Sequence, residues 1–234
     1  MKKLVIALTV FCAAGQALGL TLIGPPAATL DEREYAAGFS YCKSQEDIEV
    51  TALGVTVTDK DVKVDTYMAN MMLGLGQGWE LQVDLGVSET EYYDLESTED
   101  FTVGFAVKKT FWEREKIKWG AALAIHGYRA SESGVELGVP WTEEDKWHEV
   151  QIAVGPSYND GTWCLYGGPF LHFIRGGYDL SEDGVDVSGD FEEDSMVGGF
   201  VGVQVDLGKN AKMGFEYQRT GSADAIGASI LFRF

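Results

Sequence analysis

The sequence has few basic residues, few cysteines and no long hydrophobic run. Its 18 lysines and arginines are outnumbered by 37 aspartates and glutamates, which gives a net charge of −19. We therefore expect no nucleic acid among its partners, because nucleic acids are bound through their negative phosphates. The three cysteines form no metal-binding cluster, and the sequence has no phosphate-binding loop or nucleophile elbow. The motifs of several enzyme classes are thus missing.

The N-terminal apolar run, residues 4–14, is about half as long as a membrane-spanning helix requires. Two lysines precede it and small residues follow it, which is the pattern of a secretory signal peptide. Ala17 and Gly19 occupy the small-residue positions of a cleavage site, so we place the signal peptide at residues 1–19, with cleavage after Ala17 as the second choice. Loss of the two lysines leaves 16 basic and 37 acidic residues and changes the net charge from −19 to −21.

After residue 20 there is no sustained 3.6-residue period, whereas apolar residues alternate with others in ten separate segments. Short gaps between the segments, at 76–78, 113–116, 159–161 and 208–210, are expected to be tight turns. The other gaps, which we expect to be long loops apart from a short one at 220–223, lie at 45–61, 88–100, 130–147 and 176–195. Tight turns at one end and long loops at the other are typical of outer-membrane barrels. The sequence predicts an all-β, transmembrane, antiparallel up-and-down β-barrel of about ten strands, with eight or twelve as alternatives.

The two faces of the predicted strands differ in a way that favours a membrane over water. One face is apolar and includes Leu123 and Val201, which we place at mid-bilayer. The other mixes small residues such as Gly202 with charges of both signs, which suits a narrow lumen with its own polar network. Aromatic residues at both strand ends suggest two interfacial girdles, with Tyr128 in the upper one. Cys42 and Cys164 lie near opposite ends of strands far apart in order, so we expect free thiols although an exported chain permits a disulfide.

The C-terminus adds a resemblance to a known family. The signal peptide, the alternating strands and the final Phe-Arg-Phe together resemble the outer-membrane β-barrel proteins of Gram-negative-type bacteria, of the small OmpA/OmpX-like or ten-stranded type. The resemblance implies that residues 20–234 form one barrel domain in the outer membrane, surrounded by outer-membrane lipid. It also implies that Phe232 and Phe234 belong to a C-terminal signal that is read by the barrel assembly machinery. The oligomeric state stays open.

Two of the expected loops are strongly acidic. Residues 88–100 and 177–195 carry fourteen carboxylates, which repel one another or bind cations. A solvated acidic surface is the simpler interpretation. The alternative is a site for Ca²⁺ or another divalent cation at 179–190, because four residues have the spacing of a calcium loop: Asp179, Ser181, Asp183 and Asp190. Against it, position 12 is an aspartate instead of a glutamate, and strands flank the segment.

Two histidines are candidates for a site inside the barrel. Counting back from the turns places His126, His172 and Glu149, or Gln151 in place of Glu149, on three adjacent strands, facing inward near the outer mouth. A carboxylate that orients a histidine is a catalytic arrangement, and the resemblance includes barrel proteases and lipid A-modifying enzymes. No serine nucleophile or aspartate pair can be placed beside it, so we expect a lumenal hydrogen-bond network.

These observations predict a non-enzymatic outer-membrane protein of structural or interaction type, with acidic extracellular loops and at most a narrow cation-preferring conduit. One alternative is a hydrolase or lipid A-modifying enzyme at the barrel mouth, and another is a passive porin for small solutes. We expect no cofactor apart from the divalent cation considered at 179–190.

The C-terminal aromatic residue yields a first testable prediction. Replacing Phe234 by alanine is expected to lower the amount of protein in the outer membrane, because the substitution removes both a girdle residue and part of the assembly signal. Quantitative immunoblots of membrane fractions would measure this, with Phe173→Ala as a control aromatic outside the C-terminal strand. Equal amounts of wild-type and Phe234→Ala protein would mean that the ending is incidental.

Overall fold

The computed structural model describes residues 19–52, 55–92, 95–96, 100–136, 139–182, 185–193 and 196–234. Most of the predicted signal peptide, residues 1–18, lies outside these ranges. No helix in the described part is long and apolar enough to cross a membrane. The strands are β1 (Tyr35–Ala52), β2 (Val55–Gly76), β3 (Trp79–Tyr92), β4 (Leu95–Glu96), β5 (Asp100–Arg114), β6 (Ile117–Glu136), β7 (Val139–Asn159), β8 (Trp163–Glu182), β9 (Val185–Glu193), β10 (Val197–Asp206), β11 (Ala211–Arg219) and β12 (Ala223–Arg233).

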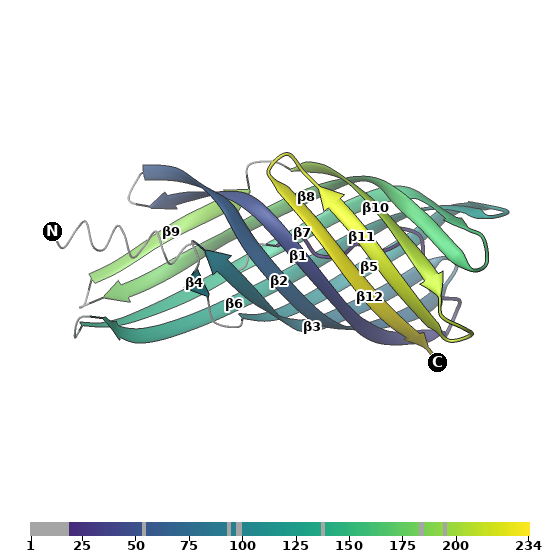
Figure 1. Ribbon diagram of the computed structural model, residues 1–234, viewed down its shortest axis with the longest axis horizontal. Coiled ribbons are helices and arrows are strands. Elements are labelled where there is room, and N and C mark those ends of the chain that lie inside the picture. The colour runs from purple at the N-terminus through teal and green to yellow at the C-terminus, as the bar shows by residue number, and fades with distance from the viewer. Residues whose placement is uncertain are drawn as a thin grey trace.

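Ten of these strands form a closed antiparallel barrel (Figure 1). Strand β12 pairs with β1, from Ala36 opposite Arg233 to Glu46 opposite Ala223, so the barrel has no free edge. A closed sheet satisfies every backbone group of the wall internally, as a bilayer requires. The prediction of an all-β, ten-stranded up-and-down barrel is confirmed. We call the end with the tight turns and the C-terminus the base, and the opposite end the mouth.

The wall has fewer strands toward the mouth. The β11–β12 hairpin is short, and above its tip β9 takes its place and pairs with β1, beginning with Ile48 opposite Glu193. Because β9 also pairs with β8, strands β1, β2, β3, β5, β6, β7, β8 and β9 form a second closed circuit. Barrel diameter grows with strand number, so the lumen narrows from ten strands to eight at this level.

The expected long loops are largely wrong, because strands continue into them. β1 and β2 pair up to Ala52 opposite Val55, and β6 and β7 pair up to Glu136 opposite Val139. Likewise, β8 and β9 pair up to Glu182 opposite Val185. Beyond the lipid both faces of a hairpin meet water. The strand therefore continues there without the row of apolar residues that identifies it in the sequence.

The prediction of which face meets lipid is confirmed. Leu123 and Val201 are 37% and 51% exposed on the outer surface, whereas Gly202 is buried in the lumen. Exposed tryptophans near the base, such as Trp79 and Trp163, match the expected lower girdle. Tyr128 does not belong to the upper girdle, because its side chain is buried inside the barrel. The register of β6 puts it on the same face as His126, two residues earlier.

The N-terminal segment before β1 lies inside the barrel, which the sequence did not predict. Residues 19–31, which we call the plug, are mostly buried, and Leu20 and Thr21 are almost completely so. At the base the segment is fixed to β2, since the Arg33 N–H donates to the Gly74 carbonyl over 2.9 Å. Followed backwards from Tyr35, the chain thus turns into the lumen and runs toward the mouth.

The lipid-facing assignment can be tested at mid-bilayer. Leu123→Arg is expected to destabilise the barrel by about 2–4 kcal/mol, because it puts a charge into the hydrocarbon layer. The measurement is urea unfolding in lipid vesicles, followed by tryptophan fluorescence. Thr142→Arg is the control, because Thr142 is exposed on the extension of β7 beyond the lipid. An equal loss of unfolding free energy in both variants would contradict the assignment.

Candidate functional site: the plug and the lumenal polar network

Four lumenal glutamates, one each from β1, β3, β7 and β11, bind backbone N–H groups of the plug. Glu216 accepts the N–H groups of Ile23 and Gly24, both over 2.9 Å. The plug has no secondary structure to satisfy these donors, and an unpaired buried N–H group costs free energy. The inward carboxylates therefore accept the N–H groups of the plug, as the carbonyls of a neighbouring strand accept N–H groups in a sheet.

Glu80 binds the part of the plug that lies nearer the base. One of its carboxylate oxygens accepts the N–H groups of Thr29 over 2.7 Å and of Leu30 over 3.0 Å. Its other oxygen lies 4.0 Å from the ammonium of Lys108, which is also buried. Next to Lys108, Gly24 has a φ of 67°, a conformation that side chains rarely adopt. Glycine therefore fits this bend of the plug.

The mouth-side end of the plug is held by the other two glutamates. The Leu20 N–H donates to Glu46 Oε1 over 2.8 Å, and the Thr21 N–H donates to Glu149 Oε1 over 3.3 Å. Plug carbonyls are bound as well. The Thr21 carbonyl accepts from the side-chain amides of Gln151 over 3.2 Å and of Gln218 over 2.7 Å. Both the donors and the acceptors of this short stretch thus have partners from the wall.

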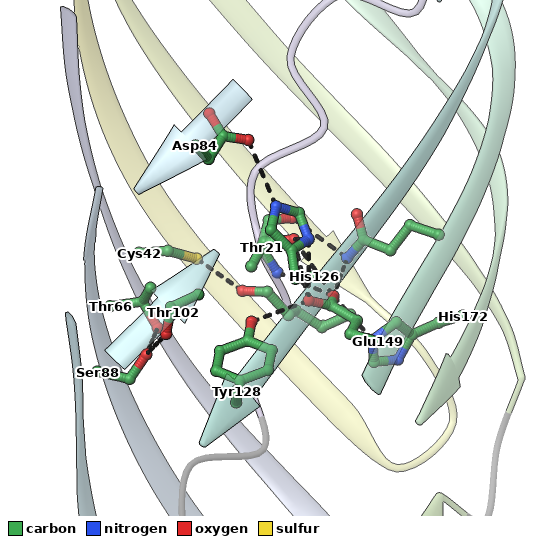
Figure 2. A network of polar contacts seen from close by, with 12 residues as sticks. Thr21, Cys42, Thr66, Asp84, Ser88, Thr102, His126, Tyr128, Glu149 and His172 are labelled. Carbon is green, nitrogen blue, oxygen red and sulfur yellow. Dashed lines mark hydrogen bonds and ion pairs between the residues drawn. The ribbon is translucent and has the colours of Figure 1, made fainter. Parts of the chain in front are cut away.

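Glu149 is the centre of a buried polar network (Figure 2). His172 Nε2 lies 3.0 Å from Glu149 Oε1, and His126 Nδ1 lies 3.4 Å from Oε2. The Tyr128 hydroxyl donates to Oε2 over 3.0 Å, and Gln151 Nε2 donates to Oε1 over 2.7 Å. The structure therefore brings together His126, Glu149 and His172, the three residues that the sequence placed on adjacent strands.

Asp84 and Thr21 belong to the network but were not among the sequence candidates. Asp84 Oδ2 lies 3.4 Å from His126 Nε2, and Asn70 donates to its other oxygen over 2.7 Å. Thr21 Oγ1 lies 3.1 Å from His126 Nδ1 and within 3.3 Å of both Glu149 oxygens. Asp84 lies on the face of its predicted strand that points into the lumen, and this position could have identified it as a member of the network. Thr21 had no such signal, because it precedes the first strand.

The network is enclosed on every side. Thr21, His126, Glu149 and His172 are each at most 2% exposed. The cavity between the plug and the wall, lined by Asp84 and His126 among others, has a volume of about 50 Å³, enough for roughly three waters. A hydroxyl, a histidine and an aspartate are in contact, as in a hydrolase, but a substrate of ordinary size has no room beside them.

The residues of the proposed calcium loop lie on a hairpin. Asp179 and Ser181 belong to β8, Asp190 belongs to β9, and Asp183 lies outside the described residues. Asp179 is opposite Ser188, and Asp190 is opposite Gly177. The paired strands space the described residues along the hairpin. Binding of a divalent cation by these residues stays a prediction.

The described residues contain no group of three or more histidine, cysteine or carboxylate side chains that could hold a metal ion. Both cysteines of the predicted mature chain, Cys42 and Cys164, are buried free thiols, as the sequence predicted. The Cys42 thiol donates to the Leu20 carbonyl over 3.0 Å. That cysteine therefore contributes to the mouth-side end of the plug site.

The role of Glu149 can be measured directly. Glu149→Ala is expected to cost about 3–5 kcal/mol of unfolding free energy, because it leaves two histidines, Tyr128 and the Thr21 N–H without their buried acceptor. Glu144→Ala on the same strand is the control. Glu144 forms exposed ion pairs with Arg129 and Lys146, which contribute about 1 kcal/mol or less. Similar losses in urea unfolding would show that the network is not a structural centre.

Two solved structures are similar to the chain over nearly its whole length. The translocator domain of autotransporter NalP from Neisseria meningitidis is 10% identical with a TM-score of 0.53, and the match covers 98% of this chain and 95% of that one. The outer membrane protease OmpT from Escherichia coli is also 10% identical, with a TM-score of 0.51 and coverage of 94% and 97%. Neither a protein-family model nor a curated protein matches the sequence. By its fold and its exposed apolar belt, the chain is a β-barrel protein of the outer membrane.

Proposed function

We propose that this protein is a closed outer-membrane barrel of structural or interaction type, whose own N-terminal plug fills the lumen. The observation that carries the proposal is the binding of plug N–H groups by Glu46, Glu80, Glu149 and Glu216. Hydrogen bonds to charged acceptors are stronger than neutral ones. A segment held by this many of them stays in place, so the resting barrel does not conduct.

The narrow cation-preferring conduit is then a property of the barrel without its plug. If residues 20–30 leave the lumen, the same four glutamates line the opened path. Lys108 is the one lysine among the most buried polar residues of the described chain, so the negative charge in the lumen exceeds the positive charge. Such a path prefers cations. The passive porin, the other transport alternative, requires a permanently open lumen and is disfavoured by the plug.

The strand extensions at the mouth supply the surface for interactions. They rise beyond the apolar belt as paired hairpins, and they carry acidic side chains such as Asp179 and Asp190. Rigid hairpins present side chains with a smaller entropy loss on binding than loops do. A basic protein surface or divalent cations are the partners that this charge favours.

The enzyme alternatives receive less support. A hydrolase or lipid A-modifying enzyme needs its catalytic groups open to substrate, whereas His126 and His172 are enclosed by the plug and the wall. We propose that the protein is not an enzyme. The network instead holds Thr21 and thereby the plug. At the base, Phe234 is 80% exposed while its N–H donates to the Tyr35 carbonyl, a placement that leaves the aromatic ring accessible to the assembly machinery during folding.

Conductance in planar bilayers tests this proposal. Protein refolded from a chain that begins at Leu20 is expected to be silent. Protein that begins at Asp31 is expected to conduct with a preference for cations, because the plug is gone and the glutamates line the lumen. Resistance of each folded barrel to SDS without boiling checks that both have closed. Conduction by the longer chain would overturn the closed barrel, and silence of the shorter chain would show that wall side chains alone close the lumen.

A further inference from the structure

We infer that the lumen contains a binding site for the mature amino terminus: cleavage between Gly19 and Leu20 creates an α-ammonium on Leu20 that pairs with the buried carboxylate of Glu46 and locks the plug. This inference rests on the proposed plugged barrel and adds what fixes the plug at its free end. Hydrolysis adds one water across the Gly19–Leu20 amide. Gly19 leaves with the leader as a carboxylate, and the amine of Leu20 takes up a proton.

The contact on which the inference depends is short and buried. The Leu20 nitrogen lies 2.8 Å from Glu46 Oε1, and the two residues are 0% and 1% exposed. As an amide, this nitrogen donates one hydrogen bond and brings no charge. As an ammonium it donates three and brings a positive charge next to the buried carboxylate.

The shape of the lumen independently places the end of the plug at this level. Glu46 is the last residue of β1 that pairs with β12, and from Ile48 onward β1 pairs with β9. The wall therefore changes from ten strands to eight just beyond the Leu20 nitrogen. An eight-stranded barrel is wide enough for its own side chains and little else.

Aromatic rings fill the narrow part. Tyr128 and Trp147 are both buried, and their rings stack with centroids 5.1 Å apart. Trp147 lies opposite Gly176, which in turn lies opposite Phe191 of β9, so these rings belong to the eight-stranded circuit.

The lumen is tight at Gly19. A Cβ atom added there would lie 2.8 Å from Ser44 Oγ and 3.1 Å from two atoms of Val64. Larger side chains therefore do not fit at residue 19 without movement of Ser44 or Val64. The carboxylate of Glu46 favours a chain that begins at Leu20, the cleavage position that the sequence predicts.

Two of the other buried glutamates also have basic side chains beside them. Glu80 has the Lys108 ammonium at 4.0 Å, and Glu149 has His126 and His172 beside it. The proposed α-ammonium brings a positive charge to Glu46, so a processed chain closes the lumen more firmly than an unprocessed one.

Two measurements test the site. Intact mass of the outer-membrane protein is expected to show a chain that begins at Leu20. Barrels refolded from that chain are then treated with an amine-reactive acylating reagent, and acylation of the α-amine is followed by peptide mass spectrometry. The α-amine of the folded barrel is expected to react at least about tenfold more slowly than in urea, because an ion-paired buried ammonium gives a free-energy difference of that size or more.

Glu46→Gln keeps the shape of the side chain and removes its charge, so it is expected to abolish most of this protection. Glu216→Gln is the matched control, because Glu216 binds the plug at Ile23 and Gly24 but not at its end. If Glu46→Gln does not fold, the stability of wild-type chains with a free amino terminus is compared with that of chains with an acetylated one. Acetylation is expected to lower the folding equilibrium constant about tenfold.

The outcomes separate this inference from the proposed function. A mature chain that begins at another residue, an α-amine that reacts equally fast in the folded barrel and in urea, or an acetylated chain of unchanged stability each overturns the ammonium site. Conductance is read on the same samples. A barrel that does not conduct but has a freely reactive α-amine supports the proposed function and rejects the ammonium site. A barrel that conducts but has a protected α-amine supports the ammonium site and rejects the proposed function.

Discussion

The structure depends on a single constraint, which is that irregular backbone buried inside a barrel must find hydrogen-bond partners in the wall. The plug is such a backbone, and glutamates on β1, β3, β7 and β11 supply acceptors at intervals along it. Two of them have basic side chains beside them, Glu80 with Lys108 and Glu149 with His126 and His172. The polar lumen therefore serves the plug, because its carboxylates accept N–H groups that a strand-free segment leaves without a neighbouring strand.

The change in strand number links this lumen to the outer surface. Because the β11–β12 hairpin ends early, β9 closes the wall against β1 above it. The wide lower part holds the plug, and the narrow upper part holds stacked aromatic rings and supports the hairpins that rise from the mouth. The short β11–β12 hairpin thus determines how much space the plug has in the lower lumen. It also determines how firmly the hairpins at the mouth are supported. Lengthening that hairpin would widen the upper lumen and remove the stop at Leu20.

Much of the wall could be predicted from the sequence, because lipid on one side and a polar lumen on the other impose strict alternation on each strand. Leu123 outside and Gly202 inside followed from that alternation, and so did the meeting of His126, Glu149 and His172, since register in a closed sheet is fixed by the turns. Alternation carries no information beyond the lipid, which is why the sequence predicts loops where the strands extend. The plug has no period at all, and its partners lie up to 204 residues away. Tyr128 was misplaced because an aromatic residue near a strand end suits either the girdle or the lumen.

The plug also constrains the order of assembly. It is continuous with β1 at the base, where Arg33 is bonded to Gly74, and its free end points toward the narrow mouth. A segment fixed at the base cannot enter from the mouth, so it enters from the base, or the wall closes around it when β12 pairs with β1. In either case its leading end must be small and able to reach Glu46. The proposed cleavage after Gly19 would create such an end at Leu20.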